Sequence, residues 1–350
     1  MNYADRMSRL GTESAFEVLV RARALEAKGR DVVHLEIGEP DFDTPPHIVE
    51  AGKQALDDGY THYVPTYGLP EVREAIAEHM SVTRNISATP EQVVVTPGAK
   101  PVMFFALLAL AEEGDEVIYP DPGFPIYESV IRFVGAKPVP VPLREERDFG
   151  LDVNELKDLV TERTRLIILN SPQNPTGGML TPEDLEAIAE VAVARGIPVL
   201  ADEIYCRLTY DAPFASIAAY DGMQDLLIIL DGFSKTYAMT GWRIGYGVMP
   251  TDLSDQMTLL MVNSNSCTAP FTQRAALAAL TGPQEPVEEM VAEFRRRRDL
   301  FVEGLSQIPG IRCPVPRGAF YVFPNISGLG LSSKQFADRL LEEGGVAALA

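Results

Sequence analysis

"LDGFSKTYAMTGWRIGYG", residues 230–247, places a lysine in a tight turn directly after an apolar run. The five apolar residues 226–230 are typical of a buried strand, and Lys235 follows them within a few positions. An ordinary surface lysine gains nothing from such a position, whereas a lysine that acts as a nucleophile would gain a great deal. Lys235 is therefore the first candidate functional residue, and the rest of the chain has to support it.

Short apolar, β-branched runs recur along the chain and alternate with helical patterns. One such helical pattern opens with Thr181 and Pro182, a helix cap followed by a first-turn proline. Strands that are apolar throughout and joined by helices predict an α/β fold, with a largely parallel sheet covered on both faces. In such sheets ligands bind outside the C-terminal ends of the strands. The runs lie at 92–95, 115–120, 165–170, 197–202, 226–231 and 244–249, with helical patterns at 100–114 and 181–196.

The pattern changes after about residue 285, which predicts a second, smaller domain. A long charged helix at about 286–307 is followed by a predicted strand pair at 310–326 and a predicted helix at 332–345. We expect an N-terminal arm and part of the small domain at 1–45, a large domain at 46–285, and a small α+β domain at 286–350. That small domain is predicted to be incomplete, because "VAALA" at the end of the chain reads as the middle of a strand.

Charge and composition exclude several kinds of partner. The formal net charge is −20, which repels nucleic acid and anionic lipid. No apolar run approaches the roughly 20 residues that span a bilayer, and the charged, amphipathic start predicts a cytoplasmic protein. The 3 cysteines are far apart and the 4 histidines form no metal-binding pattern, so no metal site is expected.

Polar and small residues follow several of the predicted strands. Gly98 and Ala99 open a helix, where free N–H groups favour a phosphate, although a plain tight turn is an equally good interpretation of these two residues. Because the carboxyl ends of parallel strands share one edge, the side chains that follow them form one candidate site. These are Asn174, Asp202, Tyr205, Lys235 and Arg243.

This combination of residues is what pyridoxal phosphate needs. Lysine forms a Schiff base with its aldehyde, and a buried carboxylate keeps its pyridine nitrogen protonated. Phenol and amide groups can bond the ring oxygen, and arginine can neutralise the phosphate. Of the seven lysines, only Lys100 and Lys235 occupy turns at strand ends, and Lys100 opens the phosphate-binding helix and would reach away from the aldehyde. The other five lie in helical patterns or, for Lys137, in a connection.

Four segments in the same order resemble the class I/II aminotransferases, which are fold-type I pyridoxal-phosphate enzymes of the aspartate aminotransferase kind. They are "NSPQNPTGG", "ADEIY", "DGFSKTYAMTGWRIGYG" and "PRGAFYVFP", and the resemblance runs from about residue 35 to the end. It implies transfer of an amino group between an L-amino acid and a 2-oxo acid. It also implies a homodimer with its active sites at the subunit interface.

The resemblance gives each candidate residue a role. It implies that Lys235 carries the Schiff base and moves protons, and that Asp202 pairs with the pyridinium. The cofactor ring oxygen would bond Tyr205 and Asn174, and Phe124 would stack on the ring and, with Gly38 and Asn174, border the substrate. The phosphate would be held by Arg243, by the amides of Ala99 and Lys100, by Ser234, and by Tyr63 of the neighbouring subunit.

One feature of the family is missing from this sequence. The arginine that binds the substrate α-carboxylate lies in a glycine-rich motif beyond residue 350, and neither Arg317 nor Arg339 is a convincing substitute. We therefore expect either a fragment or a poor transaminase. Two alternative functions stay open, a pyridoxal-phosphate C–S β-lyase and a truncated, non-catalytic cofactor-binding protein. Release of pyruvate and ammonia from cystathionine, or cofactor binding without a half-reaction, would distinguish them.

Overall fold

A mixed eight-stranded sheet forms the centre of the computed structural model, which describes residues 1–11 and 13–350. Its strand order is β2-β9-β8-β7-β6-β3-β4-β5, and only β9 and β5 run against the others. Each of the six apolar runs at 92–249 forms a strand, which confirms the predicted α/β fold. The strands are β2 (Val93–Thr96), β3 (Glu116–Asp121), β4 (Lys137–Arg144), β5 (Gly150–Leu151), β6 (Thr164–Asn170), β7 (Val199–Asp202), β8 (Leu227–Gly232) and β9 (Gly245–Val248).

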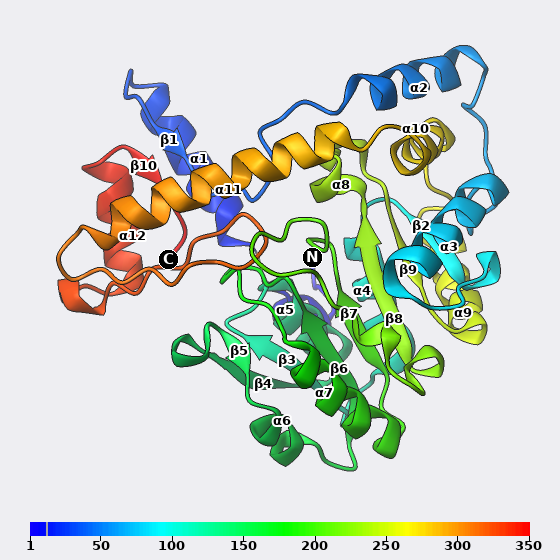
Figure 1. Cartoon of the computed structure of the whole chain (residues 1–350). Helices are drawn as coiled ribbons and strands as arrows, with labels where there is room; N and C mark the ends of the chain where they lie inside the picture. The colour runs from blue at the N-terminus through cyan, green and yellow to red at the C-terminus, as the bar shows by residue number, and fades with distance from the viewer. Residues whose placement is uncertain (12) are drawn as a thin grey trace.

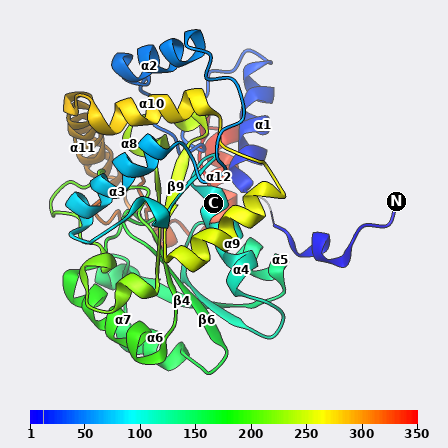
Figure 2. The ribbon, with the colours of Figure 1, turned by 90° about the vertical axis from the view of Figure 1, so that its right-hand side faces the viewer.

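Helices cover both faces of this sheet (Figures 1 and 2). One face packs against α2 (Pro46–Asp57), α3 (Pro70–Arg84), α6 (Val153–Leu159), α7 (Pro182–Arg195) and α10 (Pro270–Thr281). The other packs against α4 (Lys100–Leu110), α5 (Ile126–Val134), α9 (Thr251–Val262) and part of α11 (Glu285–Ser306). The remaining helices are α1 (Ser14–Glu26), the short α8 (Phe233–Thr236) and α12 (Ser333–Glu342).

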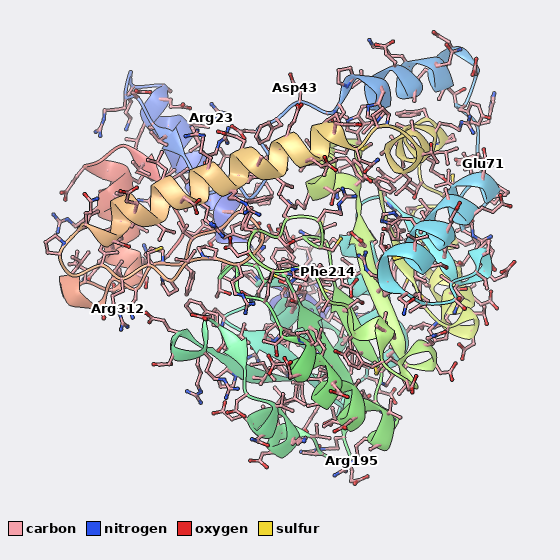
Figure 3. All side chains as sticks on the ribbon, viewed as in Figure 1. Arg23, Asp43, Glu71, Arg195, Phe214 and Arg312 are labelled. Carbon is pink, nitrogen blue, oxygen red and sulfur yellow. The ribbon has the colours of Figure 1, made fainter. Side chains whose placement is uncertain are left out.

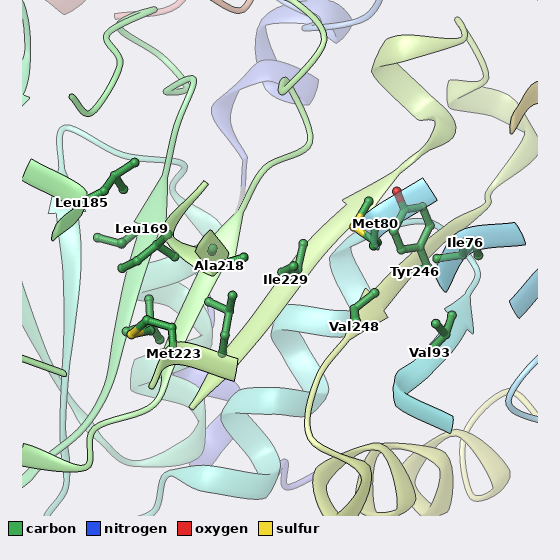
Figure 4. Close-up of a cluster of buried hydrophobic side chains, with 14 of the residues drawn as sticks. Ile76, Met80, Val93, Leu169, Leu185, Ala218, Met223, Ile229, Tyr246 and Val248 are labelled. Carbon is green, nitrogen blue, oxygen red and sulfur yellow. The ribbon is translucent and has the colours of Figure 1, made fainter. Parts of the chain in front are cut away.

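Alternation along the strands explains why their central residues form uninterrupted apolar runs. In β8, Leu227 and Ile229 belong to the core under α3 and α7, whereas Ile228 and Leu230 belong to the core under α4 and α9. Successive side chains of a strand point to opposite faces, so a sheet covered twice needs apolar residues at every position. Figure 4 shows the first of these cores, with Ile229 and Tyr246 from the sheet near Met80 of α3.

Strand β4 corrects one sequence interpretation, because Lys137 begins a strand and does not lie in a connection. Its sequence, KPVPVPLR, has prolines at alternate positions and was hard to recognise as a strand. Lys137 donates its backbone N–H to Asp115 beside β3. The alternate residues Pro138, Pro140 and Pro142 therefore turn their missing N–H positions away from β3, where prolines do no harm.

The N-terminal and C-terminal parts of the chain meet in a small two-stranded sheet. In it, β1 (Val33–His34) pairs in parallel with β10 (Val346–Ala347), next to α1 and α12, and these elements lie together in Figure 1. Helix α11 extends toward this region, and it and α12 confirm the two predicted helices.

The strand pair that was expected at residues 310–326 is absent from the structure, which describes all of this segment. Arg312 and Asn325 form one antiparallel bridge, and no ladder follows. Prolines 314, 316 and 324 cannot donate to a ladder. The N–H groups of Arg317 and Gly318 instead bond the carbonyl of Gly177, which ties this segment to the large sheet.

A buried ion network lies under the ends of β7 and β8. Arg84, at the end of α3, donates to Glu203 at 2.7 Å and to Asp231 at 2.9 Å, and all three are buried. Burial opposes the charge of Arg84, but Cys206 and the two carboxylates outweigh it and raise its pKa. The guanidinium carbon of Arg84 lies 4.9 Å from the ring centroid of Phe214, a residue that Figure 3 labels. The network joins α3 to the ends of β7, which carries Asp202, and of β8, which leads into the turn with Lys235.

Replacing Arg84 with Met should lower the free energy of unfolding by about 3–5 kcal/mol, because it leaves two carboxylates buried without a counter-charge. Urea unfolding followed by circular dichroism measures this change. The matched control is Arg132→Met, which removes the exposed Arg132–Glu128 pair and should cost less than about 1 kcal/mol. Equal losses in the two variants would contradict a stabilising role for the buried network.

Candidate active site

The C-terminal ends of the central strands lie in register along one edge of the sheet. Asn170 of β6 pairs with Asp202 of β7, which pairs with Leu230 of β8. Gly245 pairs with both Gly232 and Thr96, so the start of the antiparallel β9 lies at the same edge. The loops that leave these strands carry Asn174, Lys235, Arg243 and residues 98–100. The predicted strand-end residues therefore converge on one edge, as the parallel topology requires.

Lys235 lies in the first turn after β8, in the short helix α8. Its ammonium group donates to the carbonyl of Gly38 at 2.5 Å and lies 5.6 Å from the ring centroid of Phe320. Burial lowers the pKa of Lys235 to about 8, against the opposing effect of Glu39; Arg243 lowers it further and Asp202 raises it. At neutral pH about a tenth of the molecules would carry the neutral, nucleophilic amine.

Asp202 ends β7 and is buried. Its carboxylate accepts the hydroxyl of Tyr127 at 2.6 Å and the backbone N–H of Ile204 at 3.3 Å. Burial raises the pKa of Asp202 to about 6, although these two hydrogen bonds lower it. A carboxylate in this position lacks a cation of its own and would gain from one.

A chain of polar groups runs beside Asp202. The hydroxyl groups of Tyr205 and Tyr321 lie 2.6 Å apart, and the amide of Asn174 donates to the Tyr321 oxygen at 3.4 Å. Asn174 is itself held by its backbone N–H, which donates to Asn170 at 2.8 Å. Burial raises the pKa of both phenols, so both stay protonated at neutral pH.

Arg243 and the turn at residues 98–100 face each other. Arg243 is exposed, with a backbone φ of 53°, and donates to the carbonyl of Thr240 at 2.8 Å. A Cβ at Gly98, where φ is +87°, would lie 2.1 Å from the Arg243 guanidinium, and one at Gly245 would lie 2.5 Å from the amide nitrogen of Ala99. Only glycines allow this approach, which brings a guanidinium to the N-terminus of α4.

The other predicted residues vary in how closely they join this site. Phe124 packs edge-to-face on Tyr127 at 5.7 Å, and the Lys100 ammonium lies 5.2 Å from the Phe124 ring centroid and forms an ion pair with Glu13. Ser234 is buried beside Lys235. Tyr63 is 88% exposed within this chain.

Two site residues were missed by sequence reasoning, Tyr127 and Tyr321. Tyr321 lies inside "PRGAFYVFP", one of the four segments quoted above, and Tyr127 lies three positions after Phe124, but a tyrosine in an apolar context looks like a core residue. Their contacts join residues that are 75 and 116 positions apart in the chain, so no local pattern reveals them. Among the described residues, no group of three or more His, Cys, Asp or Glu side chains could hold a metal ion, and no helix is long and apolar enough to cross a membrane.

Known proteins are similar to this chain over most of its length. Residues 30–350 match the family described as aminotransferase class I and II. The chain is 45% identical to an aspartate aminotransferase of Pyrococcus abyssi, over 91% of this chain and 82% of that protein. It is 40% identical to an aromatic-amino-acid aminotransferase of Thermococcus litoralis, over 98% and 88%. A solved aspartate aminotransferase of Thermus thermophilus with maleate superimposes with a TM-score of 0.96, at 37% identity, over 99% and 91% of the two chains.

Replacing Tyr127 with Phe should raise the pKa of Asp202 above its value of about 6, because the hydroxyl bond that lowers it is lost. Infrared difference spectra between low and high pH measure the carboxyl titration in the cofactor-free protein. Asp202→Asn identifies the band, since that variant lacks it. A midpoint that falls in Tyr127→Phe would show that the tyrosine does not stabilise the charged carboxylate.

Proposed function

Because the chain belongs to the class I and II aminotransferase family, we propose that it moves an amino group between an L-amino acid and a 2-oxo acid with pyridoxal phosphate bound at Lys235. Amino transfer is the activity of the family, and the cofactor, the residue roles and the substrates are our proposal. The observation that carries it is Lys235 itself, a lysine at a strand end with a pKa lowered to about 8 and Asp202 close enough to influence it.

The phosphate fits the turn at residues 98–100. The N-terminus of the 11-residue helix α4 offers backbone N–H groups from Ala99 and Lys100, and Arg243 adds a guanidinium beside them. The chain has a net charge of −20, but this turn is locally positive. An anionic group would therefore bind at this turn. Ser234 and the partner subunit's Tyr63 complete the proposed set.

Asp202 and the neighbouring polar groups would hold the pyridine ring. Asp202 is buried, and its raised pKa means that its charge is costly without a partner, so a protonated ring nitrogen would stabilise it. Tyr205 and Asn174 would bond the ring oxygen, and Phe124 would stack against the ring. When bound, pyridoxal phosphate supplies an aldehyde that condenses with amines and a protonated ring that accepts electrons from the substrate Cα.

The chain's own residues then have distinct tasks. Lys235 would hold the cofactor at Nζ in the resting protein and, once free, move a proton at the substrate Cα. Its lowered pKa favours the neutral amine that both tasks need. Asp202 would keep its carboxylate charged and so keep the ring nitrogen protonated. Gly38, whose carbonyl accepts the Lys235 ammonium, would let the substrate approach closely.

We further propose a homodimer in which Tyr63 serves the neighbouring subunit. Within its own chain Tyr63 is 88% exposed, and an exposed tyrosine of this size is readily buried by a partner. The twofold axis of a C2 dimer would place the Tyr63 of each subunit at the active site of the other subunit.

Borohydride reduction of the protein loaded with pyridoxal phosphate should attach a phosphopyridoxyl group to Lys235, and peptide mass mapping locates it. Lys235→Ala should lose more than about 1000-fold of its half-reaction rate with an amino acid, because both the attachment and the proton transfer are lost. The matched control is Lys157→Ala, which removes an exposed lysine of α6 and should keep the rate. Label found on Lys100 would contradict the assignment. Aspartate, phenylalanine and alanine would form the donor panel, since relatives act by name on aspartate and on aromatic amino acids.

Mixing two inactive variants tests the dimer and the position of Tyr63 together. Tyr63→Ala and Lys235→Ala subunits, unfolded and refolded at equal ratio, should recover about a quarter of the wild-type activity, because half of the dimers then hold one intact site. If Tyr63 acts in its own subunit, every mixed site keeps a defect and no activity returns. Light scattering of the mixture checks that dimers have formed.

A further inference from the structure

Tyr321 occupies a junction between several groups of the candidate site. Its hydroxyl lies 2.6 Å from the Tyr205 hydroxyl and 3.4 Å from the amide nitrogen of Asn174. A Cβ on Gly38 would lie 2.4 Å from the same hydroxyl, so only glycine leaves room for it. No other phenol in the described residues has a hydroxyl bonded to both residues that we propose to bind the cofactor's ring oxygen.

The ring of Tyr321 is fixed as well as its hydroxyl. It packs 5.6 Å from the Tyr205 ring in an edge-to-face arrangement and 4.9 Å from the Phe320 ring. The backbone of the segment is held through Arg317 and Gly318, whose N–H groups bond Gly177, and through Ala319, whose N–H bonds the carbonyl of Leu208. The hydroxyl therefore has little freedom to choose another partner.

The direction of the hydrogen bonds follows from counting protons. Each phenol carries one proton, and Tyr205 has to direct its proton at the ring oxygen if it is to stabilise negative charge there. The proton in the 2.6 Å contact then belongs to Tyr321, which donates to the Tyr205 oxygen. Asn174 has only donors on its nitrogen, so it donates to the Tyr321 oxygen. The hydrogen bonds therefore run in one direction, from Asn174 to Tyr321, from Tyr321 to Tyr205, and from Tyr205 to the ring oxygen. Each bond polarises the next donor along this chain.

We propose that Tyr321 is a positioning residue that, by donating its hydroxyl proton to Tyr205, orients Tyr205 toward the ring oxygen of the bound cofactor and strengthens that hydrogen bond. The inference rests on the proposed function, because it requires that the cofactor binds with its ring oxygen at Tyr205. Gly38 has a second reason to be glycine, since any side chain there would displace the Tyr321 hydroxyl.

Tyr321→Phe keeps the packed ring and removes only the donor. Tyr205 then becomes a weaker and less well oriented donor, so more negative charge stays on the ring oxygen. That charge holds the neighbouring proton on the nitrogen that joins Lys235 to the cofactor more tightly. The pH midpoint of the visible absorption of the loaded protein should therefore rise, by about half a pH unit. The kcat should fall roughly five- to tenfold with little change in KM, because substrate contacts are unaltered.

A double-mutant cycle on the pH midpoint tests this. The wild type, Tyr321→Phe, Tyr205→Phe and the double variant are loaded with pyridoxal phosphate and titrated by absorption. Tyr205→Phe should shift the midpoint upward more than Tyr321→Phe does, and the double variant should match Tyr205→Phe, because Tyr321 acts through Tyr205. The control is Tyr210→Phe, which removes a phenol that bonds the carbonyl of Ala319 in the same segment and should leave the midpoint unchanged.

Three results would overturn the inference. The first is an unchanged midpoint in Tyr321→Phe, and the second is a double variant whose shift is the sum of the single shifts. The third is a raised KM with an unchanged midpoint, which would make Tyr321 a substrate contact. A wild-type protein that gains no visible absorption with pyridoxal phosphate would overturn the proposed function itself, and is recognised before any variant is compared.

Discussion

The register of β6, β7 and β8 is the constraint on which the site depends. Asn170, Asp202 and Leu230 are paired neighbours at the C-terminal edge of the sheet. The segments that follow them therefore emerge at the same edge. A slip of one residue in β7 would turn Asp202 to the other face of the sheet, and a slip in β8 would displace the turn that carries Lys235. Burial on both faces prevents the slip, because every residue of these strands would have to find a new pocket in a packed core.

Charged groups at the ends of buried strands destabilise the fold, and two features of the structure reduce this effect. Beneath β7 and β8, Arg84 neutralises Glu203 and Asp231 and ties them to α3. In the part of the chain that the structure describes, the neighbouring Asp202 and Lys235 form no ion pair of this kind. Their pKa values are shifted toward the neutral forms, to about 6 and about 8, by burial. The charges of the Arg84 network are paired within the chain, whereas Asp202 and Lys235 are the groups that we propose to pair with a ligand.

Much of the fold followed from periodicity. Strands with uninterrupted apolar centres predicted a sheet covered on both faces, and the capped helix that begins at Pro182 is where Thr181 predicted it. The failures have local causes. The alternating prolines of β4 do not resemble a strand, because proline lacks the N–H group that a strand donates. A strand tolerates them only where the missing N–H groups face away from the neighbouring strand. Residues 310–326 looked like a strand pair, but in this fully described segment the pairing stops at the bridge between Arg312 and Asn325. The N–H groups of Arg317 and Gly318 bond the loop at Gly177. The proposed domain boundaries stay predictions.

The sequence by itself determined which lysine could be the nucleophile and which residues follow the strands, because order along the chain fixes what leaves each strand end. The sequence also identified the family, because the resemblance lies in short continuous segments of the chain. Only the tertiary structure decided which groups surround those residues. Tyr127 reaches Asp202 across 75 positions, Tyr321 reaches Tyr205 across 116, and Arg84 reaches Glu203 across 119. Such contacts depend on how helices and loops pack over the sheet, and a local pattern of residues contains no record of that packing.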